Sequence, residues 1–174
     1  MLVPSSLDSI LSLACHNYRG RALVRLIDEI GGKPKIAAFD KVLEPPGEMT
    51  EFCIGGPDSN HRTKVHAENF LKGIRFLAFR QNEPDSLAII TSAGKFKHIA
   101  YEEEYVILAR LYPKPSSQPV ILISGQTSRS NQGATHYLIK NYNSTLRKQF
   151  GSKRPFCLLL KLQSPRTYGY KLID

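Results

Sequence analysis

Two segments of the sequence place glycines and small polar residues directly after an apolar run. The first reads FCIGGPDSNHRTKV over residues 52–65, and the second reads LISGQTSRSNQGATHYL over residues 122–138. Glycine lets a ligand approach the backbone closely, and hydroxyl and amide side chains hydrogen-bond phosphate oxygens or sugar hydroxyls. A helix that begins after such a loop has unpaired backbone N–H groups and a dipole that favours negative charge. Both segments therefore predict a site for an anionic ligand.

The predicted ligand-binding residues belong to these two loops and to the start of the helix after each. Backbone N–H groups would contact phosphate, the polar side chains would bond sugar or phosphate oxygens, and Arg129 with Arg62 would neutralise charge. If the two preceding strands are neighbours in one sheet, both loops meet at a single crevice. The predicted set is Gly55, Gly56, Asp58, Asn60, Arg62, Gly125, Gln126, Thr127, Ser128, Arg129, Ser130, Asn131, Gly133, Thr135 and His136.

Neither loop matches a standard phosphate-binding motif. The letters do not form GxGxxG, and GQTSRSNQG over residues 125–133 lacks the lysine of a P-loop. The simpler structural interpretation is that Asn60 is an ordinary helix cap and that residues 125–133 form a surface turn. The predicted ligand is a nucleotide-like or other anionic small molecule, and no cofactor is identified.

The remaining residues that could do chemistry predict less. His61 and His66 are five positions apart, so they do not share a helical face as an HExxH pair does, and no metal site is predicted. His136 could act as an acid or base, although a partly exposed histidine at a helix start is the simpler interpretation. The glutamates of YEEEY, residues 101–105, are expected to form a solvated turn. No catalytic set is identifiable, so catalytic residues are not assigned.

The chain contains three widely spaced cysteines without a CxxC pair, which predicts reduced thiols. Cys53 and Cys157 lie in apolar runs, where packing in the core is the usual role of cysteine. No apolar run approaches the roughly 20 residues that span a bilayer. The apolar N-terminal segment has no preceding basic residue and contains Asp8, so it is not typical of a signal peptide. These features predict a soluble, cytoplasmic protein without a membrane partner.

The positive charge is concentrated towards the C-terminus. The formal net charge is +9, and nine basic residues but only one acidic residue follow residue 128. Such a field attracts polyanions, including nucleotides and nucleic acids. With Tyr137, Tyr142 and Phe150 available for stacking, this quarter supports a second hypothesis, a nucleic-acid-binding protein. The alternative is a basic surface without a ligand, with these aromatic side chains in the core.

Apolar periodicity and turn residues predict an α/β order of elements. A helix is expected from Ser5 or Ser6 and another over residues 21–30, where Leu23, Leu26, Ile27 and Ile30 have helical spacing. Further helices are expected over residues 60–72 and 134–150. Strands are expected over residues 51–54, 74–79, 104–112, 118–125, 155–163 and 168–174, with two more strands joined by a turn within 86–101.

This order predicts a single mixed α/β domain over residues 1–174. Two strand–loop–helix units would supply parallel crossovers, and the middle segments with short turns would pair antiparallel. The expected architecture is a Rossmann-like, partly parallel central sheet with flanking helices. Residues 1–31 would form a helical N-terminal segment, and residues 50–174 would form the sheet.

Three pieces between residues 50 and 142 form a further pattern: a GGP-x-x-N turn, an arginine-containing strand that ends near a proline, and a glycine loop that opens a helix. Their residues are Gly55, Gly56, Pro57, Asn60, Arg110, Pro113, Gly125, Gly133, Ala134 and Thr135. The pattern resembles an uncharacterised bacterial Rossmann-like domain seen in regulator and defence-type proteins. That domain carries a His-Gly step where this sequence has Gln126 and Thr127. The resemblance implies a sensor or effector domain more than a known enzyme.

The first functional hypothesis is therefore a binding or sensor module for a nucleotide-like anion. A nucleotide-cleaving hydrolase that uses the same pocket is an alternative, but the sequence does not place the carboxylate that glycosidic cleavage needs. Nucleic-acid binding by the basic C-terminal quarter is the other alternative. No oligomeric state is predicted.

Overall fold

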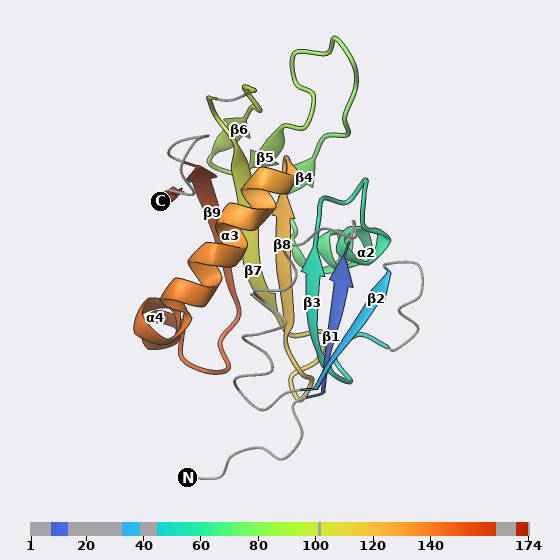
Figure 1. Cartoon of the computed structure of the whole chain (residues 1–174), viewed down its shortest axis with the longest axis vertical. Coiled ribbons are helices and arrows are strands. Elements are labelled where there is room, and N and C mark those ends of the chain that lie inside the picture. The colour runs from blue at the N-terminus through green and yellow to red at the C-terminus, as the bar shows by residue number, and fades with distance from the viewer. Residues whose placement is uncertain (1–7, 14–32, 39–44, 101, 163–169, 174) are drawn as a thin grey trace.

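The computed structural model describes residues 8–13, 33–38, 45–100, 102–162 and 170–173. A seven-stranded mixed sheet has the strand order β10-β9-β7-β8-β3-β1-β2, and a smaller sheet has the order β4-β5-β6 (Figure 1). The strands are β1 (Asp8–Leu13), β2 (Lys33–Ala38), β3 (Thr50–Ile54), β4 (Arg75–Phe76), β5 (Ile89–Thr91), β6 (Gly94–Phe96), β7 (Tyr105–Leu111), β8 (Val120–Gly125), β9 (Phe156–Leu162) and β10 (Tyr170–Ile173). The helices are α2 (His61–Phe70), α3 (Ser128–Asn141), the π-helical turn η2 (Tyr142–Leu146) and α4 (Arg147–Phe150).

The large sheet divides into a parallel half and an antiparallel half. Strands β8, β3, β1 and β2 pair parallel, whereas β7 pairs antiparallel with both β8 and β9, and β10 pairs antiparallel with β9. Each of β7 and β8 is buried along its whole length, as expected for strands that are covered on both faces. The predicted mixed α/β architecture with a partly parallel sheet is confirmed.

Each face of the sheet packs against a different helix, because successive side chains of a strand point to opposite faces. On one face, Cys53 and Leu122 belong to an apolar cluster with Ala67 of α2 and with Leu71, which follows α2, and the small β4–β6 sheet adds to this cluster. On the other face, Ile121 and Ile123 pack in a second cluster with residues of α3, including Leu138. Figure 1 shows α3 crossing in front of β7 and β8. The sheet is therefore the middle layer of the described structure.

A buried arginine fixes the end of the helical segment that follows β8. Arg110 of β7 is 1% exposed and donates to the carbonyl oxygens of Gly151 and Arg154 at 2.7 and 2.5 Å. The guanidinium also lies 5.0 Å from the ring centroid of Phe156. Carbonyl groups at a helix C-terminus carry the negative end of the dipole, so they stabilise a buried cation. Arg110 therefore joins the centre of the sheet to the chain segment between α4 and β9.

The main correction concerns the N-terminal segment. The predicted helix from Ser5 or Ser6 is wrong over residues 8–13, which form β1 between β3 and β2. Local helix preference is worth less than about 1 kcal/mol per residue, so parallel pairing on both sides of β1 outweighs it. The sheet-forming region accordingly begins before residue 50 and includes β2, which was not predicted. The predicted helix over residues 21–30 lies outside the described residues.

The other predicted elements are present with altered bounds. The strand expected over residues 74–79 is reduced to β4, and the hairpin expected within residues 86–101 is β5 and β6. The helix expected over residues 134–150 begins earlier, at Ser128, and contains the π-helical turn η2. None of the described helices is both long enough and apolar enough to cross a bilayer.

Candidate functional site

The two glycine loops lie side by side, which is the condition that the hypothesis of a shared site requires. Strands β3 and β8 are adjacent and parallel, and Ile54 pairs with Ile123 near their C-terminal ends. The N–H of Gly55 donates to the carbonyl oxygen of Ile123 at 2.9 Å. A Cβ atom on Gly56 would lie 3.3 Å from the carbonyl oxygen of Gly125, so the backbones of the two loops are in close contact. Gly55 has φ +128°, a conformation that favours glycine.

The helices that follow β3 and β8 leave the sheet on opposite faces. The cluster on one face contains Ala67 of α2, and the cluster on the other contains Ala134 of α3. Two adjacent parallel strands with connections to opposite faces form a topological switch point. In open α/β sheets, the carboxyl ends of strands at such a point are the usual place for a ligand. The two loops and the two helix starts at the carboxyl ends of β3 and β8 are called the switch-point site below.

Several polar side chains of the switch-point site are helix caps. Asn60 precedes α2, and its side-chain oxygen accepts from the N–H groups of Arg62 and Thr63 at 3.0 and 3.2 Å. Thr127 precedes α3 and forms a capping box with Ser130, whose hydroxyl accepts from the N–H of Thr127 at 2.9 Å. These bonds satisfy N–H groups that would otherwise be unpaired at the helix starts. The caps hold both loops in a defined conformation.

Gln126 and Asn131 connect the second loop to the rest of the fold. The Gln126 side chain accepts from the N–H of Tyr105 at 2.8 Å and donates to the carbonyl oxygen of Phe96 at 2.9 Å. The side-chain oxygen of Asn131 accepts from the N–H of Gly125 at 2.7 Å. Both side chains therefore have intramolecular partners, and the part they can take in ligand binding is limited to their remaining hydrogen-bonding capacity.

The two arginines predicted for this site are paired with buried carboxylates. Arg62 of α2 binds Glu51 through its Nε at 2.6 Å and through an Nη at 3.0 Å. Arg129 of α3 lies 3.6 Å from Glu104, which also accepts from the hydroxyl of Thr127. The site therefore contains both signs of charge rather than a cluster of free cations.

Other polar groups at the switch-point site remain available. Among the described residues, the backbone N–H groups of Gly56, Asp58, His61 and Ser128 have no hydrogen-bond partner. His61 and Ser128 are the first residues of α2 and α3, so these two N–H groups lie at the positive ends of the helix dipoles.

Two buried hydroxyl groups lie near the same end of the sheet. Thr63 is in the first turn of α2, and Ser124 is the penultimate residue of β8. Both side chains are fully buried, and the hydroxyl oxygen of each lacks a partner among the described residues. Buried polar groups are normally paired, so these hydroxyls mark a place where the fold leaves hydrogen-bonding capacity unused.

Three further predicted residues lie on the body of α3 and not in the loop. Gly133 packs against β9, where an added Cβ would meet the side chain of Leu162. Thr135 donates to the carbonyl oxygen of Asn131 at 2.9 Å, and His136 is exposed. The structure thus brings together the predicted residues from 55 to 62 and from 125 to 131, and places these three beyond them.

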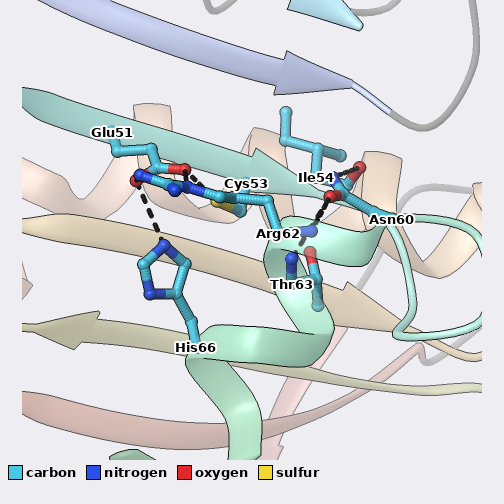
Figure 2. A network of polar contacts seen from close by, with 7 residues as sticks. All are labelled: Glu51, Cys53, Ile54, Asn60, Arg62, Thr63 and His66. Carbon is cyan, nitrogen blue, oxygen red and sulfur yellow. Dashed lines mark hydrogen bonds and ion pairs between the residues drawn. The ribbon is translucent and has the colours of Figure 1, made fainter. Parts of the chain in front are cut away.

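A buried polar cluster lies between β3 and α2, and we call Glu51, Cys53, Arg62 and His66 the Glu51 cluster (Figure 2). Glu51 and Cys53 alternate on β3 and face α2, and His66 points towards them from the helix. The Cys53 thiol lies 3.1 Å from one carboxylate oxygen of Glu51, and Nε2 of His66 lies 3.1 Å from the other. A thiol, an imidazole and a guanidinium thus converge on one carboxylate inside the core.

The cluster changes the acidity of two of its members. Burial alone would raise the pKa of the Glu51 carboxyl, but hydrogen bonds from His66 and Arg62 outweigh this effect and lower the pKa to about 2. Burial, with the adjacent Glu51 charge, raises the pKa of the Cys53 thiol well above its usual value. At neutral pH the carboxylate is therefore ionised and the thiol is protonated, in agreement with a hydrogen bond from Sγ to Glu51.

Two buried acidic residues, Glu51 and Glu104, were not among the predicted site residues. Glu51 was treated only as part of a short strand, and Glu104 was placed in a solvated turn. That expectation is wrong for Glu104, which is 5% exposed. The sequence did contain one indication for Glu51. It lies two positions before Cys53 in a predicted strand, and the alternation of side chains along a strand places both residues on one face. The partners from α2 are spatial, and the sequence spacing does not reveal them.

Most basic residues of the C-terminal quarter are exposed where the structure describes them, but its aromatic residues are not. Tyr137 is buried, and Tyr142 and Phe150 pack against the apolar cluster under α3. The predicted aromatic stacking surface is therefore not present at these positions. Five exposed cations have no ion-pair partner among the described residues: Lys140, Arg147, Lys148, Lys153 and Arg154.

Comparisons of this chain with protein-family models, with curated proteins and with solved structures found no match. The functional proposals below therefore depend on the geometry of the chain's own residues.

Proposed function

We propose that this protein is a Rossmann-like binding or sensor module for a nucleotide-like anion, held at the switch-point site. The observation that carries the proposal is the adjacency of two parallel strands whose glycine loops touch and whose helices leave on opposite faces. The resemblance to a domain of bacterial regulator and defence-type proteins agrees with a sensor role.

In this proposal, the ligand is bound mainly by backbone groups. The free N–H groups of His61 and Ser128 contact an anionic group from both helix starts, and those of Gly56 and Asp58 add donors from the first loop. The caps at Asn60 and Thr127 act by preorganising the loops, which lowers the entropy lost on binding.

A thermal-shift screen tests this function with inorganic phosphate, pyrophosphate, mononucleotides, dinucleotides and cyclic dinucleotides. A ligand present at about 100 times its Kd adds about 2.7 kcal/mol to the free energy of unfolding, which is a clear rise in Tm. A flat response over the whole panel contradicts the proposal. Incubation of each hit followed by mass spectrometry separates binding from the nucleotide-cleaving alternative, because only an enzyme yields products.

Proline substitutions at the first helical positions locate the site. Ser128→Pro and His61→Pro each remove one backbone N–H that has no partner among the described residues, and proline is favoured at this position. The residues before them, Thr127 and Asn60, already have extended backbones that tolerate a following proline. Affinity for the hit should fall in both variants while the fold is kept.

Alanine at the same positions is the matched control, because it changes the side chain and keeps the N–H group. If the proline and alanine variants bind the hit equally well, the ligand does not use these backbone groups. Unchanged binding in all four variants would place the ligand elsewhere on the protein.

A second candidate function is nucleic-acid binding, favoured by the five exposed cations that follow residue 139. They are carried by the end of α3, by α4 and by the segment that Arg110 holds. Because the nearby aromatic side chains face the core, we expect contacts to phosphates and no base stacking.

Fluorescence anisotropy with single-stranded DNA, duplex DNA and RNA at several salt concentrations tests this candidate. Replacing Lys148, Lys153 and Arg154 with glutamine should weaken binding to all sequences and reduce the salt slope by about 1 for each phosphate that is no longer neutralised. Replacing the exposed Lys64, Lys72 and Arg75 with glutamine is the charge-matched control. Equal decreases in affinity in the two triple variants would indicate attraction by net charge alone.

A further inference from the structure

The Glu51 cluster brings three metal-binding side chains together in the core. A carboxylate oxygen of Glu51, Sγ of Cys53 and a ring nitrogen of His66 all lie within 4.8 Å of one another, and all three residues are buried. We propose that these three side chains bind a divalent transition-metal ion, with Zn²⁺ as the preferred ion. This site lies between β3 and α2 and does not depend on the proposed function.

The donor set matches the chemistry of zinc. Thiolate, imidazole and carboxylate are the three side-chain ligands that Zn²⁺ takes in proteins, and a soft thiolate disfavours Mg²⁺ and Ca²⁺. Two ligands come from alternate residues of one strand and the third from a helix packed on it, so the backbone positions are fixed by the core. Three protein ligands leave one position for water or another small ligand, as in catalytic zinc sites.

The hydrogen bonds of the cluster show where the ion would lie. The Cys53 thiol and Nε2 of His66 both approach Glu51, at 3.1 Å on different carboxylate oxygens (Figure 2). Separations of this size between donor atoms suit ligands that share one ion at about 2.0–2.3 Å. On binding, the thiol proton is released to solvent, Sγ becomes a thiolate ligand, and the imidazole proton resides on Nδ1.

Arg62 orients the Glu51 carboxylate but leaves its oxygen atoms able to bind a metal ion. Its fork contacts both oxygens of Glu51, but each carboxylate oxygen has two lone pairs and can accept a second partner. Arg62 would then orient a metal-binding carboxylate from outside the ligand set, as outer hydrogen-bond partners of metal ligands do.

A purely structural role explains less of the cluster. The Glu51–Arg62 ion pair alone would neutralise the buried carboxylate, and it requires neither a thiol nor an imidazole beside it. His66 is fully buried, and its Nδ1 has no partner among the described residues. The nitrogen that faces the cluster is Nε2, which lies 3.1 Å from Glu51 and is the ring atom placed to bind a metal.

The test uses the full chain, stripped with a chelator and then titrated with Zn²⁺ or Co²⁺. We expect one tightly bound ion per chain and a cobalt–thiolate charge-transfer band. Because the chain has three cysteines, the decisive variant replaces Cys15 and Cys157 with serine and keeps Cys53 as the only thiol. The band and the stoichiometry should persist in this variant.

The reciprocal variants remove the proposed ligands. Cys53→Ser should abolish the charge-transfer band, and His66→Gln should weaken binding of both ions, with circular dichroism confirming that each variant is folded. The proposal is overturned if the chain with Cys53 as its only cysteine binds no stoichiometric Zn²⁺ or shows no cobalt–thiolate band. It is also overturned if folded Cys53→Ser binds Co²⁺ with an unchanged spectrum. Because the cysteine-depleted variant keeps the whole cluster, a folding defect in Cys53→Ser does not affect the first criterion.

Discussion

Glu51 of β3 and Arg110 of β7 are charged side chains buried on opposite faces of the sheet, and their charges are compensated differently. Glu51 on the α2 face is 2% exposed and is surrounded by a guanidinium, a thiol and an imidazole. Arg110 on the α3 face is 1% exposed, and no carboxylate of a described residue contacts it. Its partners are backbone carbonyl groups and the ring of Phe156.

The two buried charges therefore differ in the chemistry of their partners. The carbonyl groups that contact Arg110 do not titrate, and these contacts hold the chain between α4 and β9 in place. The partners of Glu51 include a thiol and an imidazole, which titrate and bind metals.

Removing the charge of Glu51 should have the largest effect on stability. Glu51→Gln breaks the ion pair between Glu51 and Arg62, and breaking a buried pair costs about 3–5 kcal/mol. We expect the low end of this range, because Arg62 is 14% exposed and can turn partly to water. Urea unfolding at pH 7 measures the change.

The matched control for this prediction is Glu83→Gln. Glu83 pairs with Arg80 at 3.3 Å on the surface, with side chains 53% and 68% exposed, so its removal should change stability by less than about 0.5 kcal/mol. Similar effects of the two substitutions would show that burial does not strengthen the Glu51 pair.

Acid should remove the Glu51 contribution in the unmodified protein. The pKa of Glu51 is lowered from 4.5 to about 2 by folding, so its stabilisation is complete above about pH 4.5 and is lost as the pH falls towards 2. The shift corresponds to about 3 kcal/mol at neutral pH. Urea unfolding from pH 7 to pH 3 should therefore bring the native chain and Glu51→Gln closer together in stability. A constant difference over this range would mean that Glu51 titrates alike in both states.

Arg110→Met should destabilise by a smaller amount, about 2–3 kcal/mol. Methionine fills the volume beside Phe156, but the carbonyl groups of Gly151 and Arg154 are deprived of a charged donor. Because the arginine stays charged over the accessible pH range, the destabilisation should be independent of pH, unlike that of Glu51→Gln. Urea unfolding at several pH values measures the loss of stability and its dependence on pH.

Tyr112→Phe is the control for this anchor. The Tyr112 hydroxyl donates to the carbonyl oxygen of Ser152 at 3.2 Å, at the surface of the same segment. Removing the hydroxyl should cost under about 1 kcal/mol, because water replaces an exposed partner. If Arg110→Met lowers the free energy of unfolding no more than Tyr112→Phe does, water can reach the carbonyl groups and the Arg110 contacts are not needed for stability.

Local patterns predicted most of the described elements, whereas the adjacency of the two glycine loops was only a condition of the functional hypothesis. The helix that Asn60 caps was predicted from the pattern after it, with Ser59 or Asn60 as the cap, and β7 and β8 were predicted because their apolar runs are continuous. β1 was missed because the contacts that make residues 8–13 a strand come from β3 and β2, which are distant in sequence. The same limit applies to the Glu51 cluster, since His66 lies 15 residues from Glu51 and meets it only through helix packing.

A double substitution tests whether the two buried charges are independent, and it should give the smallest effect. Glu51 and Arg110 lie on opposite faces of the sheet and share no partner among the described residues. The effects of Glu51→Gln and Arg110→Met on the free energy of unfolding should therefore add within about 0.5 kcal/mol. Urea unfolding of the two single variants and the double variant at pH 7 measures the coupling. A coupling well above this value would mean that the strands between the faces transmit strain, so that the metal-binding chemistry proposed for one face depends on the anchor of the other.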